Sequence, residues 1–145
     1  MLDFSNSKIL IVGDVMLDKY YFGKVDRISP EAPVPIVNIQ KEESRLGGAS
    51  NVANNIVSLG GHSLLCGVIG HDLFGKEIER ISRHKNIDTF LLKTSSPTIT
   101  KARIIGGKQQ IVRVDYEDKS ELNADNKKLF RDTISRILPE YDILV

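Results

Sequence analysis

Cysteine is almost absent from this sequence. The 145 residues include a single one, Cys66, so no disulfide can form within the chain, as expected in a reducing compartment. Cys66 stands in the apolar run 64–69, which favours a buried strand thiol over a reactive one. The sequence therefore argues against a small secreted domain held together by disulfides.

Long apolar segments are also missing. Near the N-terminus the apolar run covers only residues 9–12, bounded by Lys8 and Gly13. A membrane-spanning helix needs about 20 apolar residues, and the core of a secretory signal needs about 7–15. We therefore expect a cytoplasmic protein with no signal peptide and no membrane partner.

The sequence has no marked excess of either charge. Lys and Arg number 20 and Asp and Glu 19, a formal net charge of +1, whereas domains that bind nucleic acids or anionic membranes carry a clear basic excess. We expect neither partner. The three histidines, His62, His71 and His84, lack the spacing of metal ligands, and no nucleophile stands beside a base. The sequence therefore predicts no metal site and no such catalytic pair.

What the chain does have is the composition of one globular domain, with 41% apolar and 27% charged residues. Continuously apolar segments alternate with segments of helical periodicity. Strands are expected at residues 8–13, 62–70, 87–93 and 141–145, and helices at residues 48–59, 72–83 and 123–138. Asn123 is the expected cap of the last helix, and Pro139 follows its end. This alternation predicts an α/β fold in which helices flank a parallel sheet.

Two segments depart from that alternation. Residues 19–40 contain three prolines, which confine a chain to edge strands and extended turns. Residues 98–115 have the pattern of a hairpin with a glycine pair in its turn. We interpret both segments as one small β-structure attached to the main sheet.

The first candidates for ligand binding follow the first expected strand. In open α/β sheets, ligands bind beyond the carboxyl ends of the strands, and Asp14 and Asp18 stand there in this sequence. Paired carboxylates can accept hydrogen bonds from sugar hydroxyls. The alternative is one turn aspartate and one surface aspartate.

A glycine pair precedes the first expected helix. Gly47 and Gly48 permit a left-handed backbone and a close-lying ligand, and the start of the helix offers free N–H groups. Asn51, one turn inside the helix, carries an amide that both donates and accepts hydrogen bonds. An ordinary tight turn into the helix is the alternative.

Basic residues gather in the predicted hairpin, at Lys101, Arg103, Lys108 and Arg113. Lys101 and Arg103 share one face of a strand, because strand side chains alternate with a period of two. Arginine forks suit phosphate oxygens. The alternative is a set of solvated charges that protect a sheet edge from aggregation.

Residues 70–76 match the phosphate-binding pattern G-x-x-x-x-G-K. That pattern requires Ser or Thr next, but Glu77 stands there, and Asp72 adds a negative charge inside the loop. We therefore reject a P-loop. A dinucleotide-binding domain is rejected too, because G-x-G-x-x-G does not follow the first strand.

Four motifs, taken in order, resemble the ribokinase-like (PfkB) carbohydrate kinases over nearly all of the 145 residues. They are Gly13-Asp14-x-x-x-Asp18, the proline-rich arm, Gly47-Gly48-Ala49-x-Asn51-x-Ala53 and Gly70-x-Asp72-x-x-Gly75. More narrowly, the strings GDVMLDKYYFG and RISPEAPVPIV resemble the D-glycero-β-D-manno-heptose-7-phosphate kinases of lipopolysaccharide core synthesis.

This resemblance implies a function. Such kinases use Mg-ATP to phosphorylate the anomeric hydroxyl of heptose 7-phosphate, and the resulting heptose 1,7-bisphosphate leads to ADP-heptose. The sugar would lie against Asp14, Gly47, Gly48 and Asn51. A β lid formed by residues 19–40 and 98–115 would cover it, and the lids of two subunits would join in a homodimer. The implied polar and phosphate contacts of the lid are Lys101, Arg103, Gln110 and Arg113.

The sequence also departs from the family it resembles. The family's catalytic aspartate lies in a Gly-Ala-Gly-Asp segment in the second half of the domain, whereas the one Gly-Asp pair here is at residues 13–14. We therefore expect residues 1–145 to be the N-terminal substrate-binding half, without the catalytic residue or the nucleotide-binding half, and inactive alone. A sheet cut at Val145 would aggregate or dimerise. The alternatives are a kinase of another sugar, and a non-catalytic module that binds sugar phosphate or dimerises.

Overall fold

A four-stranded parallel sheet forms the base of the computed structural model, which describes residues 6–145. Its strands are β1 (Lys8–Val12), β4 (His62–Gly70), β5 (Asp88–Thr94) and β8 (Ile143–Leu144). They lie in the order β5-β4-β1-β8, and every neighbouring pair is parallel. Residues 1–5, which also entered the expectation that no signal peptide is present, lie outside the described residues.

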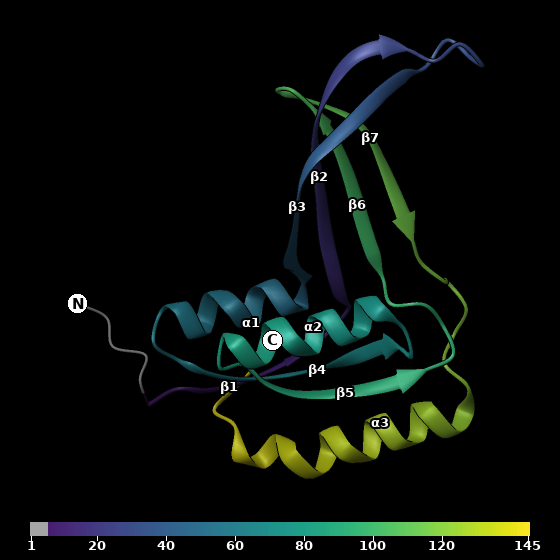
Figure 1. The fold of residues 1–145 in the computed structure, drawn as a ribbon. Coiled ribbons are helices and arrows are strands. Elements are labelled where there is room, and N and C mark those ends of the chain that lie inside the picture. Colours follow the sequence, from purple (N-terminus) through teal and green to yellow (C-terminus); the bar gives the residue numbers. More distant parts are fainter. Residues whose placement is uncertain (1–5) are drawn as a thin grey trace.

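Helices cover both faces of this sheet (Figure 1). Helices α1 (Ala49–Ser58) and α2 (Leu73–His84) lie on one face, and α3 (Ala124–Ile137) lies on the other. The main core forms between the sheet and the first two helices, where Ile11, Leu65 and Ile78 are at most 2% exposed. The predicted α/β fold, with a parallel sheet flanked by helices, is therefore confirmed.

The helix ends follow from their capping residues. The side chain of Asn123 accepts a hydrogen bond from the Asn126 N–H at 2.8 Å, which confirms the predicted cap of α3. Pro139 lies in a short 3₁₀ helix, η1 (Leu138–Glu140), directly after α3. Asp72 caps α2, whereas α1 begins after Gly48 with no side-chain cap. Among residues 6–145, no helix is long and apolar enough to span a membrane.

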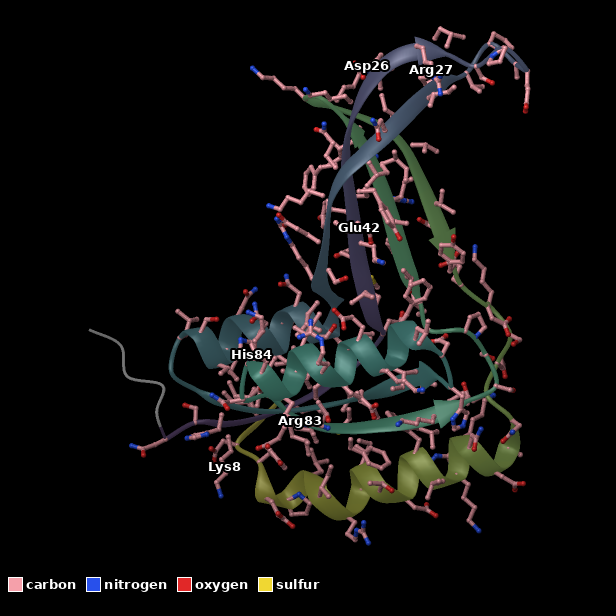
Figure 2. The ribbon with its side chains drawn as sticks, viewed as in Figure 1. Lys8, Asp26, Arg27, Glu42, Arg83 and His84 are labelled. Atoms are coloured by element: carbon pink, nitrogen blue, oxygen red, sulfur yellow. The ribbon has the colours of Figure 1, made fainter. Side chains whose placement is uncertain are left out.

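A second four-stranded sheet rises from the base, and we call it the lid (Figure 1). It consists of β2 (Val15–Ile28), β3 (Pro35–Gly48), β6 (Thr100–Gly106) and β7 (Gln109–Tyr116), in the order β3-β2-β6-β7. Its two hairpins are antiparallel, and β2 and β6 join them as a parallel pair. Asp26 and Arg27 lie near the far end of the lid, while Arg83 and His84 lie at the base (Figure 2).

The predicted small β-structure is thus present, but its first hairpin extends beyond residues 19–40 at both ends. It runs from Val15 to Gly48. The reason is the placement of the prolines: Pro30 and Pro33 lie in the turn, and Pro35 is the first residue of β3. Proline interrupts a strand only where it stands inside one, so the flanking strands are free to run longer.

The lid has two chemically different faces, because neighbouring residues in register share a face. The charged face carries Asp18, Tyr20, Glu43, Arg45, Lys101, Arg103, Arg113 and Asp115. The opposite face, which we call the apolar face, carries Tyr21, Ala102, Ile104, Val112 and Val114, together with an ion pair between Lys19 and Glu42. At the base of the apolar face the Lys19 ammonium lies 5.8 Å from the ring centre of Phe74 on α2.

Candidate functional site

Three predicted site residues meet where the lid leaves the base. Gly13 and Asp14 connect β1 directly to β2, and the exposed Asp14 lies at the carboxyl end of β1. The Asp14 carbonyl accepts a hydrogen bond from the N–H of Ala49, the first residue of α1, at 2.9 Å. Val15 lies opposite Gly48 in the lid sheet. Asp14, the glycine pair and the start of α1 therefore form one junction.

The glycine pair lets the chain approach itself closely at this junction. Gly48 has φ 54 and ψ −135, a conformation that side chains disfavour. A Cβ on Gly48 would lie 2.4 Å from the Asp14 carbonyl oxygen, and one on Gly47 would lie 2.5 Å from Asp18 Oδ2. The glycines thus bring both predicted carboxylate residues against the start of α1.

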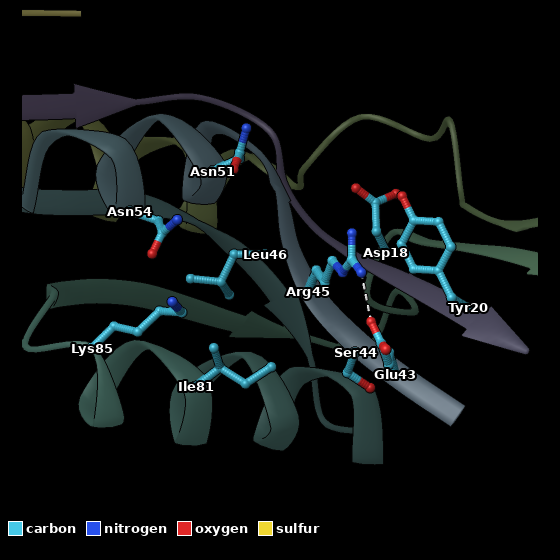
Figure 3. A pocket seen from close by; sticks show the side chains of 10 residues that line it. All are labelled: Asp18, Tyr20, Glu43, Ser44, Arg45, Leu46, Asn51, Asn54, Ile81 and Lys85. Atoms are coloured by element: carbon cyan, nitrogen blue, oxygen red, sulfur yellow. Dashed lines mark hydrogen bonds and ion pairs between the residues drawn. The ribbon is translucent and has the colours of Figure 1, made fainter. Parts of the chain in front are cut away.

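A cavity of about 590 Å³ opens beside the junction, between the charged face of the lid and the helices α1 and α2 (Figure 3). Its lining combines carboxylates, amides, cations and one aromatic ring. The lining residues are Asp18, Tyr20, Glu43, Ser44, Arg45, Leu46, Asn51, Asn54, Ile81 and Lys85. A small set of convergent polar groups in a hollow of this size suits a polyhydroxylated, charged ligand.

Two guanidinium groups flank Tyr20 at this cavity. The Arg103 guanidinium centre lies 5.3 Å from the centre of the Tyr20 ring, and that of Arg45 lies 4.8 Å from it. Arg103 Nη1 donates to Asp18 Oδ1 at 2.5 Å, and Arg45 Nη2 donates to Glu43 Oε2 at 2.5 Å (Figure 3 draws the second pair). Each arginine is therefore oriented by both an aromatic ring and a carboxylate.

These ion pairs also change the acidity of the groups. The hydrogen bond to Asp18 raises the pKa of Arg103 above its ordinary value. Hydrogen bonds from Lys41 and then Arg45 lower the pKa of the Glu43 carboxyl. Both arginines therefore stay positively charged at neutral pH and can attract an anion.

The other lid residues predicted from the sequence lie farther along the charged face. Lys101 Nζ lies 3.9 Å from Asp115 Oδ2, and Arg113 Nε donates to Asp115 Oδ1 at 2.9 Å. Gln110 is exposed and lies opposite Ile105 toward the outer end of the lid. None of Lys101, Gln110 and Arg113 lines the cavity with Asp18 and Asn51.

Asp14 lines a second, smaller cavity of about 220 Å³ at the carboxyl end of β1 and β4. Gly13, Gly67, Ile99 and Phe130 also line it. Asp14 and Asp18 therefore line different hollows, although the glycine pair lies against both residues. The sequence placed both carboxylates at the same mouth without distinguishing these positions.

Sequence reasoning missed Tyr20, Arg45 and Lys85 as cavity residues. The alternation of side chains along the strand that contains residues 43–45 could have placed Arg45 on the same face as Glu43. The approach of Arg45 to Tyr20 needed the register of β2 against β3. Lys85 carries no signal of its own, because it reaches the cavity through the packing of α2 beside α1.

The described residues do not fit the phosphates of Mg-ATP. In the loop that resembles a P-loop, the Asp72 carboxylate accepts a hydrogen bond from the Gly75 N–H at 2.8 Å and so occupies the start of α2. A nucleotide phosphate would meet this carboxylate there, which agrees with the rejection of a P-loop. Within residues 6–145, no cluster of three or more His, Cys, Asp or Glu side chains is placed to hold a metal ion.

Comparison with known sequences gives close relatives. The chain is 46% identical over 142 residues to the D-beta-D-heptose 7-phosphate kinase of Bordetella bronchiseptica, covering 97% of this chain and 45% of that protein. It is 46% identical over 138 residues to the bifunctional protein HldE of Nitratiruptor sp., covering 95% of this chain and 30% of that protein. The chain thus spans less than half the length of these relatives.

Comparison with solved structures shows the fold. A carbohydrate kinase from Agrobacterium tumefaciens superposes with a TM-score of 0.70 at 17% identity, covering 95% of this chain and 44% of that one. The model of the pfkB family of carbohydrate kinases matches residues 6–143. This match covers nearly the whole chain and includes the first strand, the lid, the glycine pair and all three helices. The chain belongs to the pfkB family of carbohydrate kinases.

Proposed function

We propose that residues 1–145 are the N-terminal, substrate-binding part of a kinase that phosphorylates D-glycero-β-D-manno-heptose 7-phosphate at its anomeric hydroxyl. The product would be heptose 1,7-bisphosphate, a precursor of ADP-heptose and the lipopolysaccharide core. One observation carries the proposal: Asp14, the glycine pair and α1 meet beside a polar cavity that Arg45 lines and where Arg103 pairs with the lining residue Asp18. The 46% identity to a heptose 7-phosphate kinase supports this choice of sugar.

Different residues of the junction, the cavity and the lid would contact different parts of the sugar phosphate. Asp14 is exposed and can accept hydrogen bonds from sugar hydroxyls, and the Asn51 amide can both donate and accept. Arg45 and Arg103 present guanidinium forks that suit the 7-phosphate. Asp18 orients Arg103 and contributes a second carboxylate to the cavity. Lys101, Gln110 and Arg113 provide further polar contacts once the lid covers the sugar.

ATP with Mg²⁺ would supply the phosphoryl group, as is general in this family. The described residues do not fit that group, so the proposal assigns the nucleotide site and the catalytic aspartate to a second half of the kinase domain. In this chain the residues bind and orient the sugar and place its hydroxyl. We expect the chain alone to bind heptose 7-phosphate without turning it over, in the cytoplasm, where ATP is available.

Calorimetry with heptose 7-phosphate tests the proposal. Asp14→Ala should weaken binding at least about tenfold, because it removes a charged acceptor of hydrogen bonds. The hydrogen bond to Ala49 comes from the Asp14 backbone carbonyl, so the junction keeps it. Asp26→Ala is the matched control, since Asp26 is an exposed carboxylate near the far end of the lid.

Four results would contradict the proposal. Equal binding by the Asp14→Ala variant and the unchanged chain would show that the sugar does not contact Asp14, contrary to the proposed site. Absence of binding by the unchanged chain, or tighter binding of another sugar phosphate, would favour the alternatives of a non-catalytic module or a kinase of another sugar. ATP-dependent turnover by the chain alone would contradict the assignment of catalysis to a second half.

We also propose that two copies of the chain associate through the apolar face of the lid. Val112 and Val114 are 47% and 40% exposed there, and exposed apolar side chains grouped on one face mark interaction surfaces. A second lid offers the same apolar face, so a twofold dimer would cover both.

A further inference from the structure

The motif Gly70-x-Asp72-x-x-Gly75 takes no part in the sugar site, yet its acidic residue is fully engaged. Asp72 Oδ1 accepts hydrogen bonds from the Gly75 N–H and the Thr98 hydroxyl, each at 2.8 Å. Asp72 Oδ2 accepts from the Thr98 N–H, also at 2.8 Å. The Thr98 hydroxyl in turn accepts from the Gly70 N–H at 2.8 Å. One partly buried cluster therefore joins the β4–α2 turn to the segment that leads into β6.

The two glycines of the motif make room for this cluster. A Cβ on Gly70 would lie 2.6 Å from the Ser96 carbonyl oxygen and 2.7 Å from Asp72 Oδ2. A Cβ on Gly75 would lie 2.6 Å from the Gly70 carbonyl oxygen and 3.0 Å from Thr98 Oγ1. The two glycines of the motif thus leave the space that Thr98 occupies, and Thr98 is only 1% exposed there.

Helix capping alone does not account for these contacts. Asn123 caps α3 with one oxygen atom and one hydrogen bond. Asp72 caps α2 in the same way through Oδ1, but its second oxygen and the Thr98 hydroxyl add bonds that a cap does not need. A cluster of polar groups that are hydrogen-bonded to one another fixes the relative positions of its members.

The cluster is continuous with the lid. The carbonyl of Ile99, the residue after Thr98, accepts a hydrogen bond from the Leu17 N–H of β2 at 2.9 Å. Strand β6 begins at Thr100, with Leu17 opposite Thr100 and Tyr20 opposite Arg103. Thr98 therefore lies directly before the strand whose register brings Arg103 to Asp18.

We propose that Asp72 and Thr98 are positioning residues: together they form a latch that fixes the start of β6 and so holds Arg103 against Asp18 and Tyr20 at the cavity. Its consequence for ligand binding rests on the proposed function, whereas its consequence for the lid does not. The latch acts through Arg103 and touches no ligand itself.

Hydrogen exchange of individual segments tests the latch directly. Asp72→Asn keeps an oxygen for the Gly75 N–H but loses the second acceptor for Thr98. Thr98→Val removes the hydroxyl with little change of shape, and Thr98→Ser restores it. Asp72→Asn and Thr98→Val should speed exchange in β6 at least about tenfold more than in β4. Thr98→Ser should remain close to the unchanged chain.

Asn123→Ala is the control for the loss of a helix cap, because it removes a comparable bond at α3 and should leave β6 unchanged. If Asp72→Asn does not fold, the Thr98→Val and Thr98→Ser pair decides. Exchange that rises equally in β4 and β6, or that is as fast in Thr98→Ser as in Thr98→Val, would overturn the latch.

Calorimetry with heptose 7-phosphate then separates the two proposals. A selective loosening of β6 with affinity reduced at least about tenfold supports the positioning of Arg103. A selective loosening with unchanged affinity overturns that positioning role. If the unchanged chain does not bind heptose 7-phosphate, the proposed function fails, and the exchange result still decides whether the latch exists.

Discussion

At the scale of single residues, Gly48 shows how closely the junction is built. It combines a positive φ of 54 with a prospective Cβ contact of 2.4 Å to the Asp14 carbonyl oxygen. Gly60 also has a positive φ, 88, but nothing lies within 4 Å of its prospective Cβ. Alanine substitutions at these two glycines therefore compare the free-energy cost of strain plus steric overlap, at Gly48, with that of backbone strain alone, at Gly60.

We expect Gly48→Ala to lower the free energy of unfolding by about 2–4 kcal/mol, since it adds overlap to strain. Gly60→Ala should cost only the strain, about 1 kcal/mol. Urea denaturation of both variants measures the difference. Equal destabilisation would show that the junction can relax around a side chain, contrary to the tight approach described here.

Cys66 gives a second prediction at this scale. Its side chain is 0% exposed, and burial raises the pKa of the thiol to about 11. The thiolate is the reactive form, so at pH 8 about one molecule in a thousand would carry it even if a reagent had access. Labelling with a thiol reagent at pH 8 should be at least about a hundredfold slower in the folded chain than in guanidinium chloride. Equal rates would contradict burial of this strand.

The sequence predicted some of these contacts and not others. Asp14 and the glycine pair are recognisable because each stands at the end of an element, where α/β sheets bind ligands. The pairing of Asp18 with Arg103 is not recognisable, because the two are 85 residues apart and meet through the parallel register of β2 and β6. That register arises from contacts between segments far apart in the chain, so the order of the residues does not reveal it.

At the scale of elements, α3 is the helix held least firmly. It has no buried residue, and its main aromatic contact places the Phe130 ring centre 5.9 Å from that of Phe90 on β5. Helix α2, by contrast, buries Ile78 and Ile81 in the core. Local opening requires little energy where few apolar contacts are lost.

We therefore expect the amides of α3 to exchange at least about tenfold faster than those of α2. Phe130→Ala should speed exchange in α3 further and leave α1 and α2 unchanged. Leu129→Ala is the matched control, because Leu129 is 53% exposed on the same helix. Exchange measured by mass spectrometry decides, and equal protection of α2 and α3 would contradict this view of α3.

Element types were predictable here because local signals agree with the fold. The apolar runs mark β1 and β4, and Asn123 marks the start of α3. The lengths of β2 and β3 were not predictable, because the sequence alone does not tell whether a proline lies inside a strand or in the turn beside it. Only the folded chain reveals that Pro30 and Pro33 lie in the turn between two long strands.

At the scale of the whole molecule, the apolar face of the lid predicts association. We expect a dimer in sedimentation velocity that dissociates on dilution, since weak interfaces depend on concentration. Val112→Lys combined with Val114→Lys should give a monomer of unchanged stability, because both side chains are already 40% or more exposed. Leu129→Lys on α3 is the control and should remain dimeric.

A monomer at every concentration would contradict the proposed association. A dimer that persists in the double variant would show that the interface lies outside the apolar face of the lid.

The parallel pairing of β2 with β6 also has a consequence for how the protein is made. The ribosome releases β2 and β3 long before β6, because α1, β4, α2 and β5 lie between them in the chain. A newly synthesised first hairpin must therefore wait, with its inner edge uncovered, until the core has folded and β6 has emerged. Contacts between distant parts of a chain form slowly and expose nascent strands to misassembly. Completion of the lid should therefore be a late step in the folding of this protein.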